Sequence, residues 1–91
     1  MAIVFILSYL MAANLKTDIE AYVINKVKEK REEHKFSQSE LAVRLNVSNG
    51  FIGQAESSKS PTKYNLNHLN QLAVIFGCSI KDFIPEEPFK K

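Results

Sequence analysis

Residues 37–56, SQSELAVRLNVSNGFIGQAE, decide the fold of this 91-residue chain. Residues 37–40 (SQSE) have the S-x-x-E form, in which a hydroxyl and a carboxylate satisfy the free amides at a helix start. Apolar residues follow at helical spacing, and Asn46 tolerates the left-handed conformation of a tight turn. Ser48 is suited to cap a second helix, which we expect to run from 49 to 56 or 57. The segment therefore predicts two short helices joined by a compact turn.

Further helices are predicted on both sides of this segment. Residues 17–20 (TDIE) repeat the S/T-x-x-E form and begin a helix. Its apolar stripe recurs every four residues, at Ile19, Val23 and Val27, with Arg31 next in line. After a polar loop over 58–63, a second stripe ends at Gly77 and consists of Leu66, Leu69, Leu72, Ala73 and Phe76. A short helix capped by Ser79, carrying Ile80, Phe83 and Ile84, precedes Pro85. We expect an all-α fold of five helices.

The first thirteen residues differ from the rest, because twelve of them are apolar and none is charged. The run is shorter than the roughly 20 residues that a membrane-spanning helix requires, and no basic residue precedes it as in a secretory signal. Two interpretations stay open. Residues 1–14 are an upstream extension, with Met11 as the natural start, or an oligomerisation arm. The expected domain then covers 15–85, and 86–91 form a C-terminal tail.

Composition argues against several functional classes. One cysteine, Cys78, cannot form an internal disulfide, which fits a reducing cytoplasm. His34 and His68 have no ligand-spaced partners, so we expect no metal and no cofactor. The sequence contains no recognisable catalytic arrangement and no phosphate-binding glycine motif, which predicts a protein that is not an enzyme. A net charge of +2 permits a nucleic-acid partner without requiring one.

Together with NLNHLNQLAVIFGCSIKDFI at 65–84, the segment 37–56 resembles the phage repressor and Cro type of helix-turn-helix protein, also called the xenobiotic response element family. The resemblance covers about residues 18–84 and implies a five-helix repressor-like domain. It makes double-stranded DNA the expected partner and 49–56 the recognition helix in the major groove. Where relatives often carry longer side chains, this chain has Gly50 and Gly53.

The resemblance places base contacts at the start of the recognition helix, on Asn49, Gly50, Phe51 and Gln54. The carboxamides of Asn49 and Gln54 suit bidentate hydrogen bonds to adenine. Gly50 and Gly53 indicate either a close approach of the backbone to DNA or to another surface, or a weak or degenerate operator; both alternatives stay open. Phe51 contacts a thymine methyl or a sugar edge, or it packs against the loop that follows; both alternatives stay open.

The resemblance also implies contacts with the DNA backbone and one structural ion pair. Gln38 lies where relatives contact a phosphate at a helix start. The other expected backbone contacts lie in and before the loop after the recognition helix: Ser57, Lys59, Lys63 and Tyr64. Arg31 and Glu56 match positions that form a partly buried ion pair in relatives.

These observations predict a cytoplasmic DNA-binding transcriptional regulator. We expect a repressor that binds a palindromic operator as a homodimer, with half-sites about 34–36 Å apart. Residues 3–13 are a candidate dimer contact. The alternative is an antitoxin, a protein-binding module that neutralises a cognate toxin and also controls its own operon.

Overall fold

A computed structural model describes residues 15–90 of the chain. The described residues form four α-helices and one short 3-10 helix, without any strand: α2 (Asp18–Glu33), α3 (Gln38–Leu45), α4 (Phe51–Glu56), α5 (Leu66–Phe76) and η1 (Ile80–Phe83). The all-helical fold is confirmed, but the last of the five expected helices is a 3-10 turn. The predicted arm at 3–13 lies outside the described residues. Within 15–90, no helix has both the length and the apolar character needed to cross a membrane.

Local signals set most of the helix ends. Thr17 and Glu20 form the predicted reciprocal cap at the start of α2. Ser37 caps α3 through its hydroxyl, but the predicted return bond from Glu40 is absent, because that carboxylate contacts Arg44 at 3.2 Å instead. Asn46 ends α3 in the left-handed conformation, with a φ of 61°, as its short polar side chain allows.

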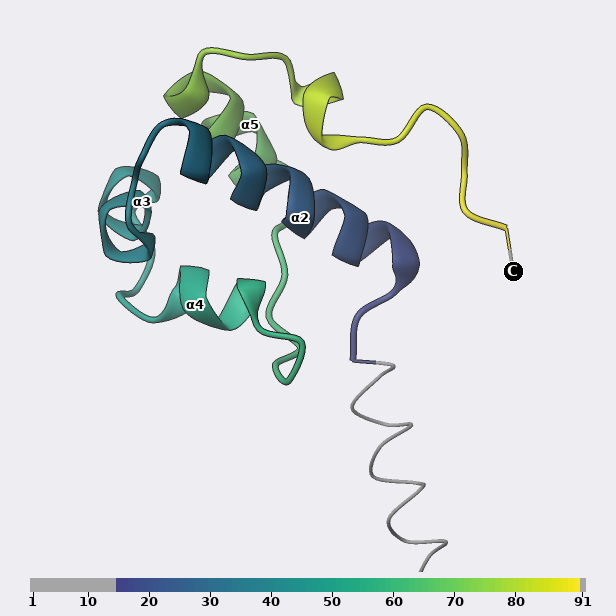
Figure 1. The fold of residues 1–91 in the computed structure, drawn as a ribbon, viewed down its shortest axis with the longest axis horizontal. Helices are drawn as coiled ribbons and strands as arrows, with labels where there is room; N and C mark the ends of the chain where they lie inside the picture. Colours follow the sequence, from purple (N-terminus) through teal and green to yellow (C-terminus); the bar gives the residue numbers. More distant parts are fainter. Residues whose placement is uncertain (1–14, 91) are drawn as a thin grey trace, which may run out of the picture.

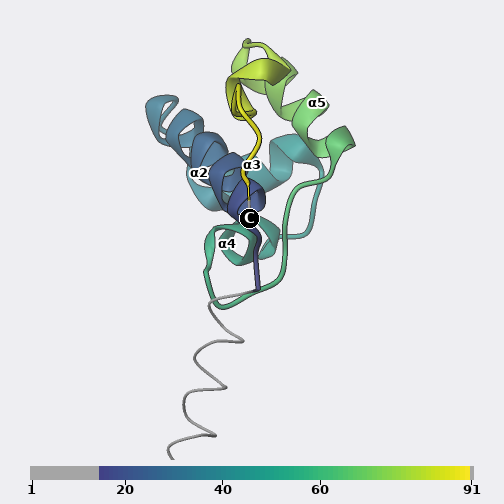
Figure 2. The same ribbon diagram turned by 90° about the vertical axis from the view of Figure 1, so that its right-hand side faces the viewer.

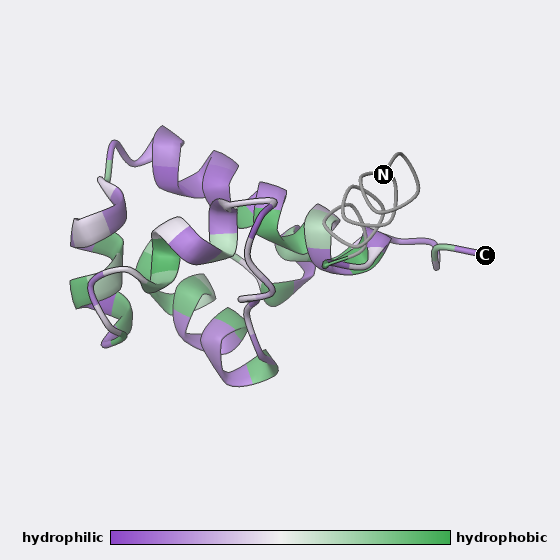
Figure 3. Ribbon diagram, turned by 90° about the horizontal axis from the view of Figure 1, so that it is seen from below, coloured by the Kyte–Doolittle hydropathy of each residue, from purple (hydrophilic) through white to green (hydrophobic). Residues whose placement is uncertain are grey.

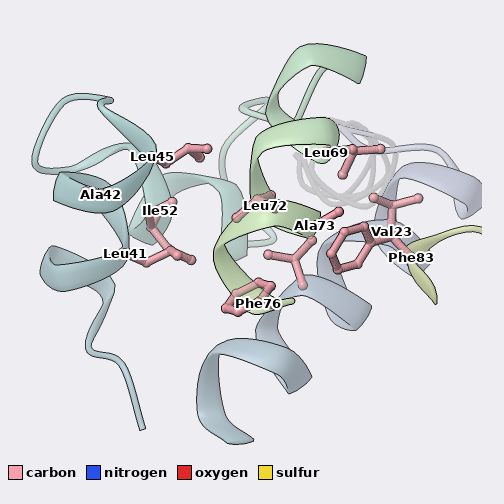
Figure 4. Close-up of a cluster of buried hydrophobic side chains, with 11 residues drawn as sticks. Val23, Leu41, Ala42, Leu45, Ile52, Leu69, Leu72, Ala73, Phe76 and Phe83 are labelled. Carbon is pink, nitrogen blue, oxygen red and sulfur yellow. The ribbon is translucent and has the colours of Figure 1, made fainter. Parts of the chain in front are cut away.

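A single core joins all five elements (Figure 4). Each contributes one of the five largest fully buried side chains, namely Val27, Leu41, Ile52, Leu72 and Phe83. Burying a side chain of this kind contributes about 1.5–3 kcal/mol. The predicted stripes were wrong at their ends, since Ile19 and Leu66 are 43% and 79% exposed. In the last expected helix, Phe83 is fully buried, whereas Ile80 and Ile84 are 39% and 36% exposed.

The arrangement leaves α4 at the edge of the molecule. In Figures 1 and 2, α2 runs through the middle of the fold, with α4 on one side and η1 on the other. Figure 3 looks onto the α4 side, where the last turns of α2 are strongly hydrophilic. The described part of the tail also returns to α2, because the Phe89 ring lies 6.0 Å from that of Tyr22.

Candidate nucleic-acid interface

The predicted recognition helix begins later than expected. α4 starts at Phe51, so Asn49 and Gly50 form a turn ahead of it instead of its first residues. Ser48 does not cap the helix with its side chain; its carbonyl oxygen accepts the Phe51 amide at 3.0 Å. Gly50 occupies the cap position and can offer no side-chain acceptor. The start of α4 is therefore set by backbone hydrogen bonds alone.

Three of the expected base-contacting residues share an exposed edge. Asn49, Gly50 and Gln54 are all exposed. Among the described residues, no atom lies within 4 Å of the position that a Cβ at Gly50 would take. Gln54 accepts a hydrogen bond from the Thr62 hydroxyl at 3.3 Å, which orients its carboxamide. This edge can present two carboxamides and a bare stretch of backbone to a ligand.

Phe51 and Tyr64 contribute to internal packing. The Phe51 ring lies 5.1 Å from that of His68 and 6.0 Å from that of Tyr64, so it packs on the segment after α4. The Tyr64 hydroxyl is buried with no hydrogen-bond partner among the described residues, and burial raises its pKa. It therefore cannot make the predicted phosphate contact in this conformation, because the oxygen does not reach the surface.

Gln38, on α3, lies against α4. Its Nε2 donates to Oε1 of Glu56 at 3.0 Å, and its Oε1 lies 3.2 Å from the position of a Cβ at Gly53. The surface that comes close to Gly53 is thus the start of α3, whereas at Gly50 the space is open. The two glycines, which the sequence could not tell apart, therefore lie in different surroundings.

Arg31 and Glu56 form a bidentate ion pair between α2 and α4. Arg31 Nε donates to Glu56 Oε2 at 2.8 Å, and Nη2 donates to Oε1 at 2.9 Å. The third guanidinium nitrogen, Nη1, donates to the Phe36 carbonyl at 2.9 Å. The two side chains are 11% and 4% exposed, and the hydrogen bonds with Glu56 raise the pKa of Arg31. The pair fixes the last turn of α4 to the end of α2.

Lys16, which the sequence analysis did not single out, also contacts the last turn of α4. Its Nζ donates to the carbonyl oxygens of Gln54, Ala55 and Ser57, with the Ala55 contact at 2.6 Å. These carbonyls lie at the C-terminal end of α4, where the Gln54 oxygen also accepts the Ser57 amide at 3.1 Å and the Ser57 oxygen the Ser60 amide at 3.4 Å. No local pattern could have revealed the contact, because the partners lie 38 to 41 positions apart in the sequence.

The loop after α4 distributes its polar groups unevenly. Lys63 donates to Glu20 Oε2 at 2.7 Å, and this hydrogen bond lowers the pKa of Glu20. Lys59 is exposed, and within 15–90 no ion-pair partner lies near it. The Ser57 hydroxyl accepts the Lys59 amide at 3.2 Å. Of the two lysines expected to contact phosphates, Lys59 is available to bind an anion, whereas Lys63 would first have to break its ion pair with Glu20.

An apolar hollow lies beside the end of the loop after α4. Its volume is about 180 Å³, and it is lined by α2, the start of α5, Ile84 and the loop residues Lys63 and Tyr64. Ile19, Leu66 and Ile84, which line the hollow, are among the exposed large apolar side chains of the described residues. Over residues 15–90, no group of three His, Cys, Asp or Glu side chains lies close enough together to hold a metal ion.

The comparisons with known proteins agree with this geometry. A family model described as helix-turn-helix matches residues 27–83, a span of 57 of the 91 residues. The match runs from the second half of α2 to the end of η1 and so includes the whole of α3, α4 and α5. The comparison with curated proteins and that with solved structures gave no match.

Proposed function

Because the chain belongs to the Cro/C1-type helix-turn-helix family of DNA-binding regulators, we propose that it is a repressor that binds a palindromic operator as a homodimer. α4 lies in the major groove, and each half-site is read by one copy, with centres about 34–36 Å apart. Bound in this way, the dimer occludes the promoter.

The observation that carries the proposal is the exposed edge at the start of α4. Asn49 and Gln54 present carboxamides there, which pair with adenine N6 and N7. The open space at Gly50 lets the DNA come close to the backbone. Behind the edge, the Arg31–Glu56 pair holds the helix in one orientation, so little ordering is needed on binding.

Charge supports a division between positioning and reading. Lys59 and the amide groups of its loop contact phosphates, and these contacts fix the register without distinguishing sequences. Lys63 contacts a phosphate only if its ion pair with Glu20 breaks. Readout thus falls mainly on Asn49 and Gln54.

The test begins with selection of bound duplexes from a random DNA pool. Gln54→Ala should then reduce the preference at one base pair by about 5- to 150-fold and leave other positions unchanged. Lys59→Ala is the matched control, since it should weaken all duplexes alike and reduce the slope of log affinity against log salt by about 0.9. Equal effects of both variants on every duplex would reject base reading by Gln54.

The apolar hollow supports the homodimer, since three exposed apolar side chains gather there: Ile19, Leu66 and Ile84. The same hollow is the one observation that favours the second candidate, a toxin-binding antitoxin. Sedimentation of the purified chain separates the two. A dimer at micromolar concentration supports self-association, whereas a monomer that binds no operator would favour the antitoxin.

A further inference from the structure

We propose that Lys16 is a positioning residue for α4: its ammonium group holds the C-terminal end of the recognition helix in the orientation that reads DNA. The inference rests on the proposed function for its consequence in DNA binding. The contact itself, however, belongs to the free protein and is tested there without DNA.

α4 depends on outside contacts more than the other α-helices do. It is six residues long and has no side-chain cap at its start. Gly53 lies inside it and Gly50 directly before it, and glycine disfavours helix. Isolated helices shorter than about 12–15 residues are marginal in water. The orientation of α4 must therefore come from the groups that pack against it.

The Lys16 ammonium meets α4 where a cation is most favourable. The C-terminal end of a helix carries partial negative charge and unpaired carbonyl groups. Nζ donates to three carbonyl oxygens at this end, on Gln54, Ala55 and the C-cap residue Ser57, and the first and last of these also accept a backbone amide. The contacts with Ala55 and Ser57 are partly buried, and this burial lowers the pKa of Lys16. Partial burial strengthens the attraction, because water screens it less.

The backbone that carries Lys16 is itself fixed. The next residue, Thr17, forms the reciprocal cap with Glu20 at the start of α2. Glu20 in turn accepts a hydrogen bond from Lys63 at 2.7 Å. Lys16 thus extends from an anchored helix start, so only its side chain, and not its backbone, must be ordered to reach α4.

Lys16 and Arg31 together attach the last turn of α4 to both ends of α2. α2 has 16 residues, about 24 Å of helix. Arg31, near its end, binds the Glu56 carboxylate, and Lys16, before its start, binds carbonyl groups of residues 54–57. α4 also packs on the core through Ile52 and Ala55. Together with this packing, the two attachments fix the direction in which Asn49 and Gln54 project.

The test compares three variants of the full chain. Lys16→Met keeps the length of the side chain without its charge, and Lys16→Arg keeps both charge and donors. Lys28→Met is the matched control, because Lys28 is an exposed lysine of α2. Hydrogen exchange is followed at the Gln54 amide, which bonds to the Gly50 carbonyl, and at the amides of α5 as an internal reference. DNA selectivity is the ratio of affinities for the selected duplex and a scrambled one.

With Lys16→Met, protection of the Gln54 amide should fall by about 2- to 30-fold, the range that a cation at a helix C-terminus contributes. Protection in α5 should stay at its wild-type level. DNA selectivity should fall in the same variant, while the salt slope stays unchanged. Lys16→Arg should restore both quantities, and Lys28→Met should alter neither.

Two results would overturn the proposal. One is unchanged protection in α4 with Lys16→Met. The other is a salt slope that falls by about 0.9 while protection is kept, which would make Lys16 a phosphate contact. If the wild-type chain prefers no duplex at all, the proposed function fails, and exchange alone then decides whether Lys16 holds α4.

Discussion

Breaking the Arg31–Glu56 pair should destabilise the fold strongly. A buried pair that loses one partner costs about 3–5 kcal/mol, because the surviving charge stays desolvated. Arg31→Met leaves the carboxylate of Glu56, 4% exposed, with only the Gln38 amide, so we expect the full 3–5 kcal/mol for this variant. Glu56→Gln should cost about 2–3 kcal/mol, because the charge that remains, on Arg31, is 11% exposed against 4% for Glu56 and still donates to the Phe36 carbonyl.

Urea unfolding of both single variants and the double variant measures the coupling. The double variant should cost less than the sum of the single ones by at least about 1.5 kcal/mol, since neither charge is then left alone. The matched control is the exposed pair of Arg44 and Glu40, with side chains 47% and 45% exposed, where coupling below about 0.5 kcal/mol is expected. Coupling as small in the Arg31–Glu56 cycle as in the control would refute the reasoning.

Three other predictions concern the surface and the pH dependence. Leu66→Glu should weaken self-association in sedimentation runs, whereas Val74→Glu, at an equally exposed site of α5 outside the hollow, should not; equal effects would exclude the hollow as the contact. Gly50→Ala should change the free energy of unfolding by less than about 1 kcal/mol yet weaken operator binding in a titration, because the added methyl enters space open only in the free chain; undiminished binding would contradict a close approach there. The pKa of His68, measured by NMR, should lie below its usual 6.5, because burial lowers it; an unshifted midpoint would contradict this. The neutral imidazole then contributes stability that is present above pH 6.5 and is lost as the pH falls through the pKa of the folded state. The hydrogen bond from the Asn65 amide to His68 Nδ1 should be lost in the same pH range.

The parts of the fold that the sequence predicts well are those encoded within a few residues. The cap formed by Thr17 and Glu20 spans one helical turn, and Asn46 and Gly77 take left-handed conformations at the ends of α3 and α5. Each depends on the chemistry of neighbours along the chain. The start of α4 was predicted too early because Ser48 was a plausible cap, yet the chain passes through a backbone turn before Phe51.

The candidate site was less predictable, because its support comes from distant residues. The contact of Lys16 with α4 and that of Lys63 with Glu20 join positions about 40 apart, without any periodic pattern. The burial of the Tyr64 hydroxyl likewise depends on how the loop folds back. The Arg31–Glu56 pair was expected only through family resemblance, since neither residue's spacing points to the other.

The contact between Gln38 and Gly53 limits how the base preference of this protein can be redesigned. A longer side chain at position 53 would meet the Gln38 carboxamide, which also bonds to Glu56. A larger residue at 53 therefore requires the exposed Gln38 side chain to shift by a few tenths of an ångström, which couples the two positions. Randomising positions 38 and 53 as a linked pair would open a set of specificities that single-site searches do not reach.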